Sequence, residues 1–570
     1  MVSTPAVVVG PAVTAPDDGG SSRAAWDQRA AERRWYDRRG VGAWMVLGLT
    51  VLAAAVFTAG IQTPWPWSDE GATYLALLRD WGQLPALYGG PDAPMVPYYF
   101  VVKAWATALQ AVWPSMSTLV ATRLLSAAAA TATVGVLYAL VARNAGRLAG
   151  ALAGIALMSL AGFNRYAQEA RPYAMLALAA TASWLLWDRW LRPHVAPTFT
   201  SAVENRTAVE RPWRRVGRGA GYALSLAAVA SVHTFGLFQW PAHALATVVA
   251  TSADRARRVR RIVSMAALMA TAAALAAAQV VPSLLHGTGP PGSAGARIVT
   301  LWTILTQLAR GMSAAPQPLV SAVALALAAL GASTCIKGDH ARFARNLLVW
   351  LCTPLVLELA LAVVKTNLFR LRYWIAFLPP LAALMALGAM TLASAVVGTV
   401  RHPDGGPGAS RRSRAVALAT LVATVAIAAQ AAVGMSSQLA IRAANGHGQD
   451  LAHVLALVAQ TRDQQPGIPV LIDNRSATGM LGAAEPALEA RNVLRHLDPS
   501  ASYVYTTLTH TKTVRAQLAG TTSLLWIYRG ELAAAQARSR MPHNLSALHP
   551  NVVWTKPAGP GWTVLMLDTR

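Results

Sequence analysis

GAWMVLGLTVLAAAVFTAG, residues 42–60, is a long apolar run, and WPWSDEGATY follows it at residues 65–74. The run is long enough to cross the hydrocarbon core of a bilayer, which takes about 20 residues of helix. Two adjacent carboxylates, Asp69 and Glu70, then stand at the mouth of this span, where charges are costly and usually functional. The plainer interpretation is that Ser68 or Asp69 caps the next short helix and Glu70 complements its dipole. The pair alone does not decide between a site and a cap.

Apolar runs of this kind recur along the whole chain, and the composition reflects them. Of 570 residues, 54% are hydrophobic and 13% are charged, about half the charged fraction of a soluble domain. Many apolar runs of about 20 residues, separated by arginine-rich joints, predict a polytopic α-helical membrane protein. The net charge of +24 does not indicate nucleic-acid binding, because the arginines sit in alternate loops rather than on one soluble domain. The excess of Ala, and of Arg over Lys, suggests a GC-rich, actinobacterial genome.

The arginine-rich joints set the predicted topology, because basic loops stay in the cytoplasm. Residues 1–40 are predicted to be a disordered cytoplasmic arm, and residues 41–436 a membrane module. About eleven spans place every arginine-rich joint inside and the C-terminus outside. They lie near 42–60, 121–142, 148–163, 172–190, 219–233, 236–252, 261–281, 316–335, 345–364, 373–399 and 414–436. The runs at 219–233 and 236–252 are short, so a merged pair there would alter the count.

Residues 61–119 are predicted to form one external loop that contains interfacial helices. The stretch from Pro97 to Trp105 is hydrophobic enough to span, but it carries Lys103 among Tyr and Trp side chains. That mixture suits a helix lying at the membrane surface. A span here would flip every later loop and place the basic cluster Arg255–Arg261 outside, against the positive-inside rule.

The hydrophobicity pattern of the sequence changes after about residue 437. Helical periodicity at 449–462 and 512–518 alternates with apolar strands at 469–473, 524–528 and 562–567. We therefore expect residues 437–570 to form a small external α/β domain. It contains no glycine-rich phosphate loop, and we assign it no chemistry.

Three dense polar patches remain on the predicted outer side: Asp69-Glu70, residues 164–173 and residues 365–372. Carboxylates alone can bind a cation or act as a base, but arginine beside them indicates phosphate, which a guanidinium matches with two hydrogen bonds. A lipid-linked sugar phosphate fits both kinds of group. Cations would hold the phosphate leaving group while a carboxylate takes the proton of the attacking hydroxyl.

These patches contain motifs that occur in a recognisable order. Asp69-Glu70-Gly71-Ala72-Thr73 comes first, then Asp92 with Tyr98-Tyr99, then Arg165-Tyr166-Ala167-Gln168-Glu169-Ala170-Arg171-Pro172-Tyr173, and last Arg372-Tyr373 before a Leu-Pro-Pro-Leu run. Over residues 60 to 440 the chain thereby resembles the GT-C glycosyltransferases of the family-39-like type. The resemblance is strongest to actinobacterial membrane mannosyltransferases that use polyprenyl-phosphate mannose.

The resemblance implies a GT-C type membrane protein and an inverting transfer of a sugar, most simply mannose. The donor would be a polyprenyl-phosphate sugar, and the acceptor a hydroxyl of an envelope glycan, glycolipid, lipoglycan or protein. Transfer would occur on the extracytoplasmic face of the cytoplasmic membrane. Asp69 is implied as catalytic base with Glu70 as its support, and Glu169 matches the second acidic position. Arg171 and Arg372 match positions facing the donor phosphate, and the wider substrate set is Asp92, Lys103, Arg165, Gln168, Tyr173, Arg370 and Tyr373.

Two features limit what the resemblance carries. Relatives usually have a His shortly before the Tyr-Tyr pair, whereas Pro94-Met95-Val96-Pro97 stands there in this chain, so no role for that His is transferred. No dedicated metal cage is visible, and no cofactor is certain. Asp69 with Asp92 or Glu169 could nevertheless share a divalent cation such as Mg²⁺ or Mn²⁺.

Alternatives stand beside each assignment. Glu169 could be an ion-pair partner of Arg165 or Arg171, and Arg370 and Arg372 could be headgroup anchors. His233 is more simply a packed histidine. The aromatic residues Trp65, Trp67, Tyr98 and Tyr99 could form a membrane-interface belt. For the whole chain, the alternatives are a transporter or flippase of lipid-linked sugar, or a non-catalytic envelope assembly protein.

Overall fold

The computed structural model describes residues 39–192, 212–250, 255–287, single positions between 302 and 312, and residues 318–336, 340–364, 371–400, 409–472, 475–486, 522–541 and 549–569. The predicted N-terminal arm, apart from its last two residues, lies outside this description. So do the predicted helix at 512–518 and Arg370.

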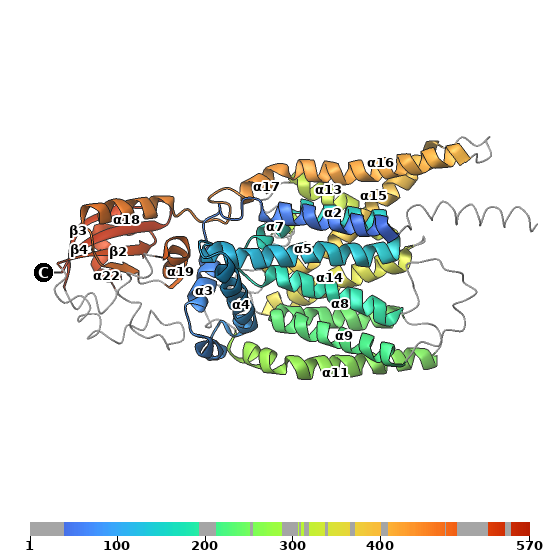
Figure 1. Cartoon of the computed structure of the whole chain (residues 1–570), viewed down its shortest axis with the longest axis horizontal. Coiled ribbons are helices and arrows are strands. Elements are labelled where there is room, and N and C mark those ends of the chain that lie inside the picture. The colour runs from blue at the N-terminus through green and yellow to red at the C-terminus, as the bar shows by residue number, and fades with distance from the viewer. Residues whose placement is uncertain are drawn as a thin grey trace, which may run out of the picture.

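Long helices lie side by side and form a bundle elongated along one axis (Figure 1). Every predicted span coincides with a helix or a helix pair of this bundle. The helices are α2 (Arg39–Thr58), α5 (Thr118–Ala145), α6 (Arg147–Ser159), α7 (Ala161–Ala167), α8 (Tyr173–Leu191), α9 (Pro212–Val232), α10 (Gln239–Val249), α11 (Arg255–His286), α13 (Pro318–Ser333), α14 (Ala341–Val364), α15 (Leu378–Val400) and α16 (Ala409–Val433).

Length and composition give five described helices that are long and apolar enough to cross a membrane, or six when the bent pair α6–α7 counts as one span. The helices α2 and α13 contain shorter apolar stretches. The prediction of a multi-pass membrane protein is confirmed, while the count of eleven spans stays a prediction. The two short predicted spans are the separate helices α9 and α10, joined by the 3₁₀ turn η4 (Thr234–Phe238).

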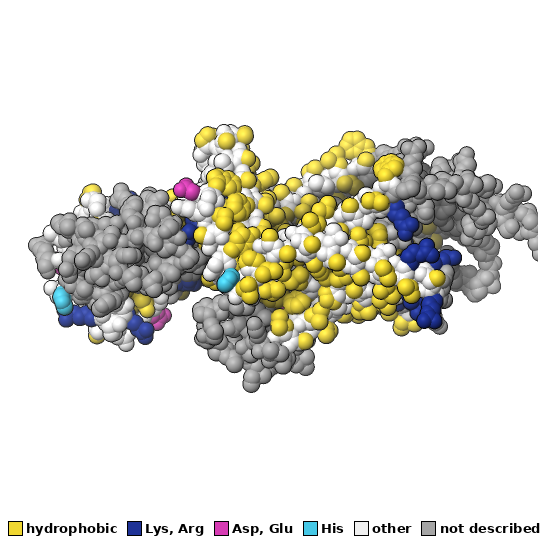
Figure 2. Space-filling model, turned by 90° about the horizontal axis from the view of Figure 1, so that it is seen from below, with side chains coloured by type: hydrophobic (Ala, Val, Ile, Leu, Met, Phe, Trp, Pro, Cys, Tyr) yellow, Lys and Arg dark blue, Asp and Glu magenta, His cyan; other side chains and the backbone are white. Residues whose placement is uncertain are grey.

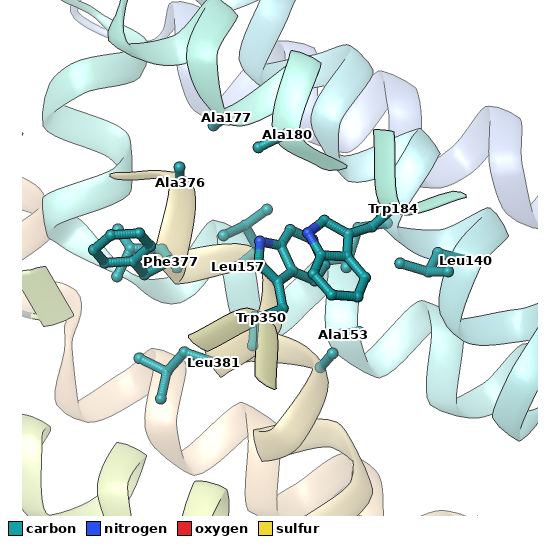
Figure 3. Packing of buried hydrophobic residues seen from close by; sticks show 14 of the residues in the cluster. Leu140, Ala153, Leu157, Ala177, Ala180, Trp184, Trp350, Ala376, Phe377 and Leu381 are labelled. Atoms are coloured by element: carbon teal, nitrogen blue, oxygen red, sulfur yellow. The ribbon is translucent and has the colours of Figure 1, made fainter. Parts of the chain in front are cut away.

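Aromatic rings and close backbone contacts fill the interior of the bundle. Trp184 stacks on Trp350 with 5.1 Å between ring centroids (Figure 3). The helices α13 and α15 cross at two glycines: a Cβ at Gly388 would lie 1.8 Å from the carbonyl oxygen of Leu327, and one at Gly331 equally close to α15. Small residues allow this backbone approach, which is how helices pack where burial in lipid supplies no hydrophobic driving force.

The segment predicted as one span at 148–163 is broken, which corrects that boundary. The helix α6 ends at Ser159, and α7 leaves it at an angle of 75°. Side chains satisfy the carbonyls that the break exposes: Asn164 donates to the carbonyl of Met158 at 2.7 Å, and Gln438 donates to that of Ser159 at 3.1 Å. The bend carries the polar residues after 164 across the end of the bundle.

Short helices cover the end of the bundle that faces the C-terminal domain (Figure 1). They come from the loop predicted at 61–119 and are α3 (Ser68–Leu77), η1 (Trp81–Gly89), η2 (Ala93–Met95) and α4 (Val96–Val112). Tyr98 and Tyr99 are buried in a small core with Leu84 and Leu87. They are therefore packed residues and not an exposed aromatic belt.

The C-terminal domain contains a four-stranded sheet in the order β1-β2-β4-β3. β1 runs parallel to β2, and the other pairs are antiparallel. α17 (Met435–Ile441) lies on the bundle against α7 and α16. The elements of the domain are α18 (Ala452–Gln464), β1 (Val470–Ile472), α19 (Arg475–Ala484), β2 (Ser523–Arg529), α22 (Ala534–Arg540), β3 (Asn551–Pro557) and β4 (Trp562–Asp568). The expected helix at 449–462 and the three expected strands are confirmed. The edge strand β3 was missed, because it is largely exposed and lacks the apolar run that marks its neighbours.

Lys and Arg side chains gather at the opposite end of the bundle (Figure 2). The first turns of α11 expose the basic cluster there, and Arg143 of α5 donates to the carbonyl of Arg192 at the end of α8. The bundle therefore has one strongly basic end, and the other end carries the acidic patches and the C-terminal domain.

Candidate active site

The helix α3 carries both predicted carboxylates in its first turn. It begins at Ser68 with Trp67 as its N-cap residue in an extended conformation, so neither Asp69 nor Glu70 occupies the capping position. Their charges still favour the positive end of the helix dipole. Capping therefore does not explain why two carboxylates occur at this point.

Glu70 is an anchor and exposes none of its side chain. Arg123 of α5 binds both of its oxygens, with Nε at 2.7 Å and Nη2 at 2.8 Å, and the backbone N–H of Ala170 donates to it at 2.9 Å. Although burial opposes ionisation, the adjacent Arg123 charge and hydrogen bonds hold the pKa of Glu70 well below its usual range. Every interaction of Glu70 ties α3 to a neighbouring element, so its role is to position α3.

Asp69 is the more accessible carboxylate, with 22% of its side chain exposed. Its Oδ2 accepts a hydrogen bond from Arg372 Nη1 at 2.5 Å and a longer one from the Tyr173 hydroxyl at 3.4 Å. Arg171 Nη1 donates to the backbone carbonyl of Asp69 at 3.3 Å. Three residues of the predicted set, from two separate segments, thus meet at Asp69.

Arg171 and Arg372 each have a hydrogen-bond donor that no described residue accepts from. Among the described residues, Arg171 Nε and Arg372 Nε are buried without a hydrogen-bond partner. Arg372 also lies over the ring of Trp67, with 5.8 Å from its guanidinium carbon to the centroid. Buried, unpaired N–H groups are uncommon in folded proteins and need an explanation. Two of them beside one carboxylate suit an anion.

The branch through Tyr99 links Asp92 to the same place. Arg171 Nη1 also donates to the Tyr99 hydroxyl at 3.3 Å, and that hydroxyl donates to Asp92 Oδ2 at 3.2 Å. Asp92 therefore supports Arg171 through a tyrosine.

Glu169 is a buried carboxyl beside this cluster. Neither of its oxygens has a hydrogen-bond partner among the described residues, so the alternative of a close ion pair with Arg165 or Arg171 is not found there. Burial, together with the charges of Glu70 and Asp69, raises its pKa to about 8. Glu169 is thus a carboxyl that holds its proton at neutral pH.

Backbone contacts pin the turn that carries Glu169. Ser126 donates to the carbonyl of Glu169 at 2.6 Å, and Thr73 of α3 donates to that of Ala170 at 2.8 Å. Gln168 donates to the carbonyls of Phe57 and Ala59 at the end of α2. Gln168, predicted to bind substrate, therefore uses its side-chain NH₂ group to fix the turn.

Lys103, predicted to bind the donor phosphate, contacts the C-terminal end of α3 in the structure. Its Nζ donates to the carbonyl of Leu77 at 2.8 Å and to the carbonyl of Arg79, at the end of α3. A cation is stabilised there by the unpaired carbonyls and the negative end of the helix dipole. Arg165, for its part, lies over the ring of Trp67 and donates to the carbonyl of His447 at 3.4 Å.

His233 is the residue that sequence reasoning set aside as packing. Its Nδ1 accepts a hydrogen bond from the Phe235 N–H at 3.2 Å, which fixes the ring proton on Nε2. That Nε2–H is buried and has no partner among the described residues. Tyr373 stacks on Phe235 at 4.0 Å and lies 5.4 Å from the His233 ring. A lone histidine after an apolar run gave no sequence signal for this placement.

Within the described part of the chain, no group of three or more His, Cys, Asp or Glu side chains is close enough to hold a metal ion. Asp69 and Glu70 are each bound by an arginine, whereas the Glu169 carboxyl group has no hydrogen-bond partner among the described residues.

The comparison with solved structures gives the fold. ArnT from Cupriavidus metallidurans, solved bound to undecaprenyl phosphate, matches with a TM-score of 0.51 at 12% identity, over 93% of this chain and 98% of that chain. The oligosaccharyltransferase AglB from Archaeoglobus fulgidus, solved with an inhibitory peptide and a dolichol-phosphate, matches with a TM-score of 0.48 at 11% identity, over 86% of this chain and 70% of that chain.

Sequence comparison adds nothing to this result: no protein-family model and no curated protein matches the chain. At 12% identity, the likeness to ArnT speaks for architecture only. The likeness to ArnT therefore confirms the predicted fold class, a polytopic helical membrane protein with a small C-terminal α/β domain at one end of the bundle.

Proposed function

We propose that the chain is an inverting glycosyltransferase that takes a sugar from a polyprenyl-phosphate donor. The observation that carries the proposal is the convergence on Asp69 of Arg171, Tyr173 and Arg372, with two arginine N–H groups left over. A carboxylate base beside an anion-binding pair is what transfer from a phosphate leaving group requires. The GT-C fold, and the undecaprenyl phosphate bound in the structure of ArnT, support this donor class.

The proposed chemistry assigns a role to the carboxylate and to both arginines. Asp69 takes the proton of the acceptor hydroxyl, whose oxygen attacks the anomeric carbon of the sugar from the face opposite the phosphate. The bond from that carbon to the phosphate oxygen breaks, and its electron pair leaves with the polyprenyl phosphate. Arg171 and Arg372 stabilise the negative charge that grows on this oxygen, because their N–H donors are already in place in a buried site.

Arg372 serves both partners through different atoms. Its Nη1 binds and orients the Asp69 carboxylate, while its Nε remains for the phosphate. His233 Nε2–H and Tyr173 stand beside the arginines as further donors. Glu169, protonated at neutral pH, can donate a hydrogen bond to a sugar hydroxyl without adding negative charge next to the phosphate.

We place the site on the extracytoplasmic face of the cytoplasmic membrane. The arginine-rich end of the bundle lies opposite the C-terminal domain (Figure 2), and basic ends face the cytoplasm. A reporter fused after residue 440 should then read as external. A cytoplasmic signal would overturn this orientation.

The alternative of a transporter or flippase is disfavoured by where the charges lie. Transporters gather them near the midplane of the membrane, at broken helices. Here they occupy α3 and the turns at the end of the bundle. Transport of lipid-linked sugar into proteoliposomes, without glycosyl transfer, would favour that alternative.

The decisive experiment measures transfer from radiolabelled polyprenyl-phosphate mannose in membranes. Asp69→Asn should lose about 100-fold or more of the rate, as expected for a removed base. Asp463→Asn, at an exposed position of α18, is the matched control and should keep full activity. Equal activity of a well-expressed Asp69→Asn protein would refute the base.

Donor recognition is tested separately. Arg372→Ala should weaken donor use and leave acceptor preference unchanged, and an unchanged donor KM would return Arg372 to the headgroup-anchor role. The sugar itself is tested by competition: polyprenyl-phosphate arabinose that outcompetes the mannose donor would reassign the specificity.

For the metal, we propose that the arginines already supply the positive charge at the phosphate, so EDTA should leave the rate unchanged. Activity lost in EDTA and restored by Mg²⁺ or Mn²⁺ would instead assign a divalent ion to the carboxylates.

A further inference from the structure

The helix α19 of the C-terminal domain packs directly against α3, the helix that carries Asp69 (Figure 1). The two helices meet at a pair of glycines, Gly71 and Gly479. A Cβ at Gly71 would lie 2.7 Å from the carbonyl carbon of Gly479, and a Cβ at Gly479 would lie 2.4 Å from the carbonyl oxygen of Gly71. Ordinary contacts of a Cβ are 3.4–4 Å. The backbones therefore touch, and both positions require glycine.

Side chains extend this contact along both helices. Ala483 of α19 is buried with Tyr74 and Leu75 of α3. Just before α3, Trp65 packs against the core of the C-terminal domain, and its backbone N–H donates to the carbonyl of Ala444 at 2.7 Å. The C-terminal domain thus contacts α3 along its length and also the residues just before its start.

A second link runs through the anchor of α3. His447, in the segment that leads into the C-terminal domain, is buried with its Nδ1 3.6 Å from Glu70 Oε2. The carbonyl of His447 accepts from Arg165. The domain therefore contacts both the glycine that follows Glu70 and the shell around Glu70 itself.

These contacts bear on catalysis because of their position. Asp69 lies two residues before Gly71 on the same turn of helix, so any displacement at the crossing moves the carboxylate by a similar amount. Well-packed interiors transmit such displacements instead of absorbing them. A shift of about 1 Å in a reacting group can cost about 100-fold in rate.

We propose that the C-terminal domain positions the catalytic carboxylate, and that Gly479 is a positioning residue for Asp69. The domain thereby acts as part of the active-site scaffold in addition to any part in binding the acceptor. This inference rests on the proposed transferase function.

The test compares Gly479→Ala with Gly82→Ala in purified full-length protein. Gly82 lies in η1 of the same loop as α3, and a Cβ there has nothing within 4 Å. In Gly479→Ala, we expect kcat to fall by about 100-fold with the donor KM within about threefold, because Asp69 moves while the phosphate-binding arginines stay. Gly82→Ala should match the wild type. The reciprocal variant Gly71→Ala should reproduce the fall in kcat.

Hydrogen exchange reads the contact without catalysis. The α3 amides should exchange faster in Gly479→Ala, whereas those of α5 and α8 should be unchanged. Ala483→Leu, which overfills the same interface through a side chain, should give a smaller change in both readouts and guards against misfolding of the glycine variants.

Two results would overturn the positioning role: a Gly479→Ala protein with kcat within about twofold of the wild type, or a fall that Gly82→Ala shares. Absence of transfer by the wild type would refute the proposed function instead. The exchange of the α3 amides would then still show whether α19 holds α3.

Discussion

Replacing Arg123 by Met should unfold the region around α3 more than it perturbs the rest of the bundle. The guanidinium of Arg123 makes four hydrogen bonds: two to Glu70, and one each to the carbonyls of Ile61 and Pro64 at 2.8 and 2.9 Å. Both side chains of the ion pair are fully buried. Breaking a buried pair by removing one partner costs about 3–5 kcal/mol, because the remaining charge has no compensation.

The loss should depend on pH in a defined direction. In the wild type, Arg123 depresses the pKa of Glu70, so the stability it contributes is present above the unfolded value of 4.5 and is lost as pH falls through the folded value. In Arg123→Met, burial without a partner should raise that pKa instead. The deficit of the variant should therefore be largest near pH 7 and should shrink as pH approaches 4.5.

The assay is thermal unfolding of the purified protein in detergent, for the wild type, both single variants and Glu70→Gln/Arg123→Met. The double variant leaves no charge at either position of the pair, so it should recover about 2–3 kcal/mol relative to the sum of the single losses. Arg123→Leu serves as a second hydrophobic replacement. A cost below about 1 kcal/mol, typical of an exposed pair, or strict additivity in the double variant, would refute the anchor role.

Three further predictions concern Glu169, Lys103 and His233. Because the pKa of Glu169 is raised, its contribution to folding stability is fully present below the unfolded pKa of 4.5 and is lost as pH rises through about 8. The melting temperature of Glu169→Gln should therefore rise relative to that of the wild type between pH 5 and pH 9. Parallel curves of melting temperature against pH would contradict this. Lys103→Met should lower stability by about 1–2 kcal/mol by freeing the carbonyls of Leu77 and Arg79, with the donor KM within twofold; a tenfold rise would return Lys103 to the phosphate. His233→Phe should raise the donor KM about tenfold by removing one hydrogen bond to a charged group, whereas an unchanged KM would leave the ring as packing.

The membrane architecture was accessible from sequence because it depends on local composition. A span needs a run of apolar residues, and its orientation follows from arginines in the adjoining loops. The same holds for the strands β2 and β4, which are buried and apolar throughout. The edge strand β3 and the bend at Ser159 were not predicted. β3 is largely exposed and has no apolar run. The carbonyls exposed by the bend are bound by Asn164 close by and by Gln438, which lies 279 residues from Ser159.

The division of roles among the polar residues followed a different rule. The order of motifs identified Asp69, Glu169, Arg171 and Arg372 as a set, but residue type and spacing cannot say what each charge meets. Glu70 and Lys103 look as reactive as their neighbours in the sequence. In the fold, Glu70 is bound by Arg123 from 53 residues away, and Lys103 closes the end of α3.

By itself, the sequence determined that the chain crosses a membrane many times, and it predicted that the carboxylates and arginines of the three polar patches share one face of that membrane. Only the tertiary structure decided that Asp69 is the accessible carboxylate, that Glu70 is its anchor, that His233 faces the same cluster, and that Gly479 touches Gly71. The reason is physical: apolar runs and loop charges can be recognised locally in the sequence, whereas burial, pairing and backbone contact depend on segments far apart in the chain, 53 residues for Glu70 and Arg123 and 303 for Asp69 and Arg372.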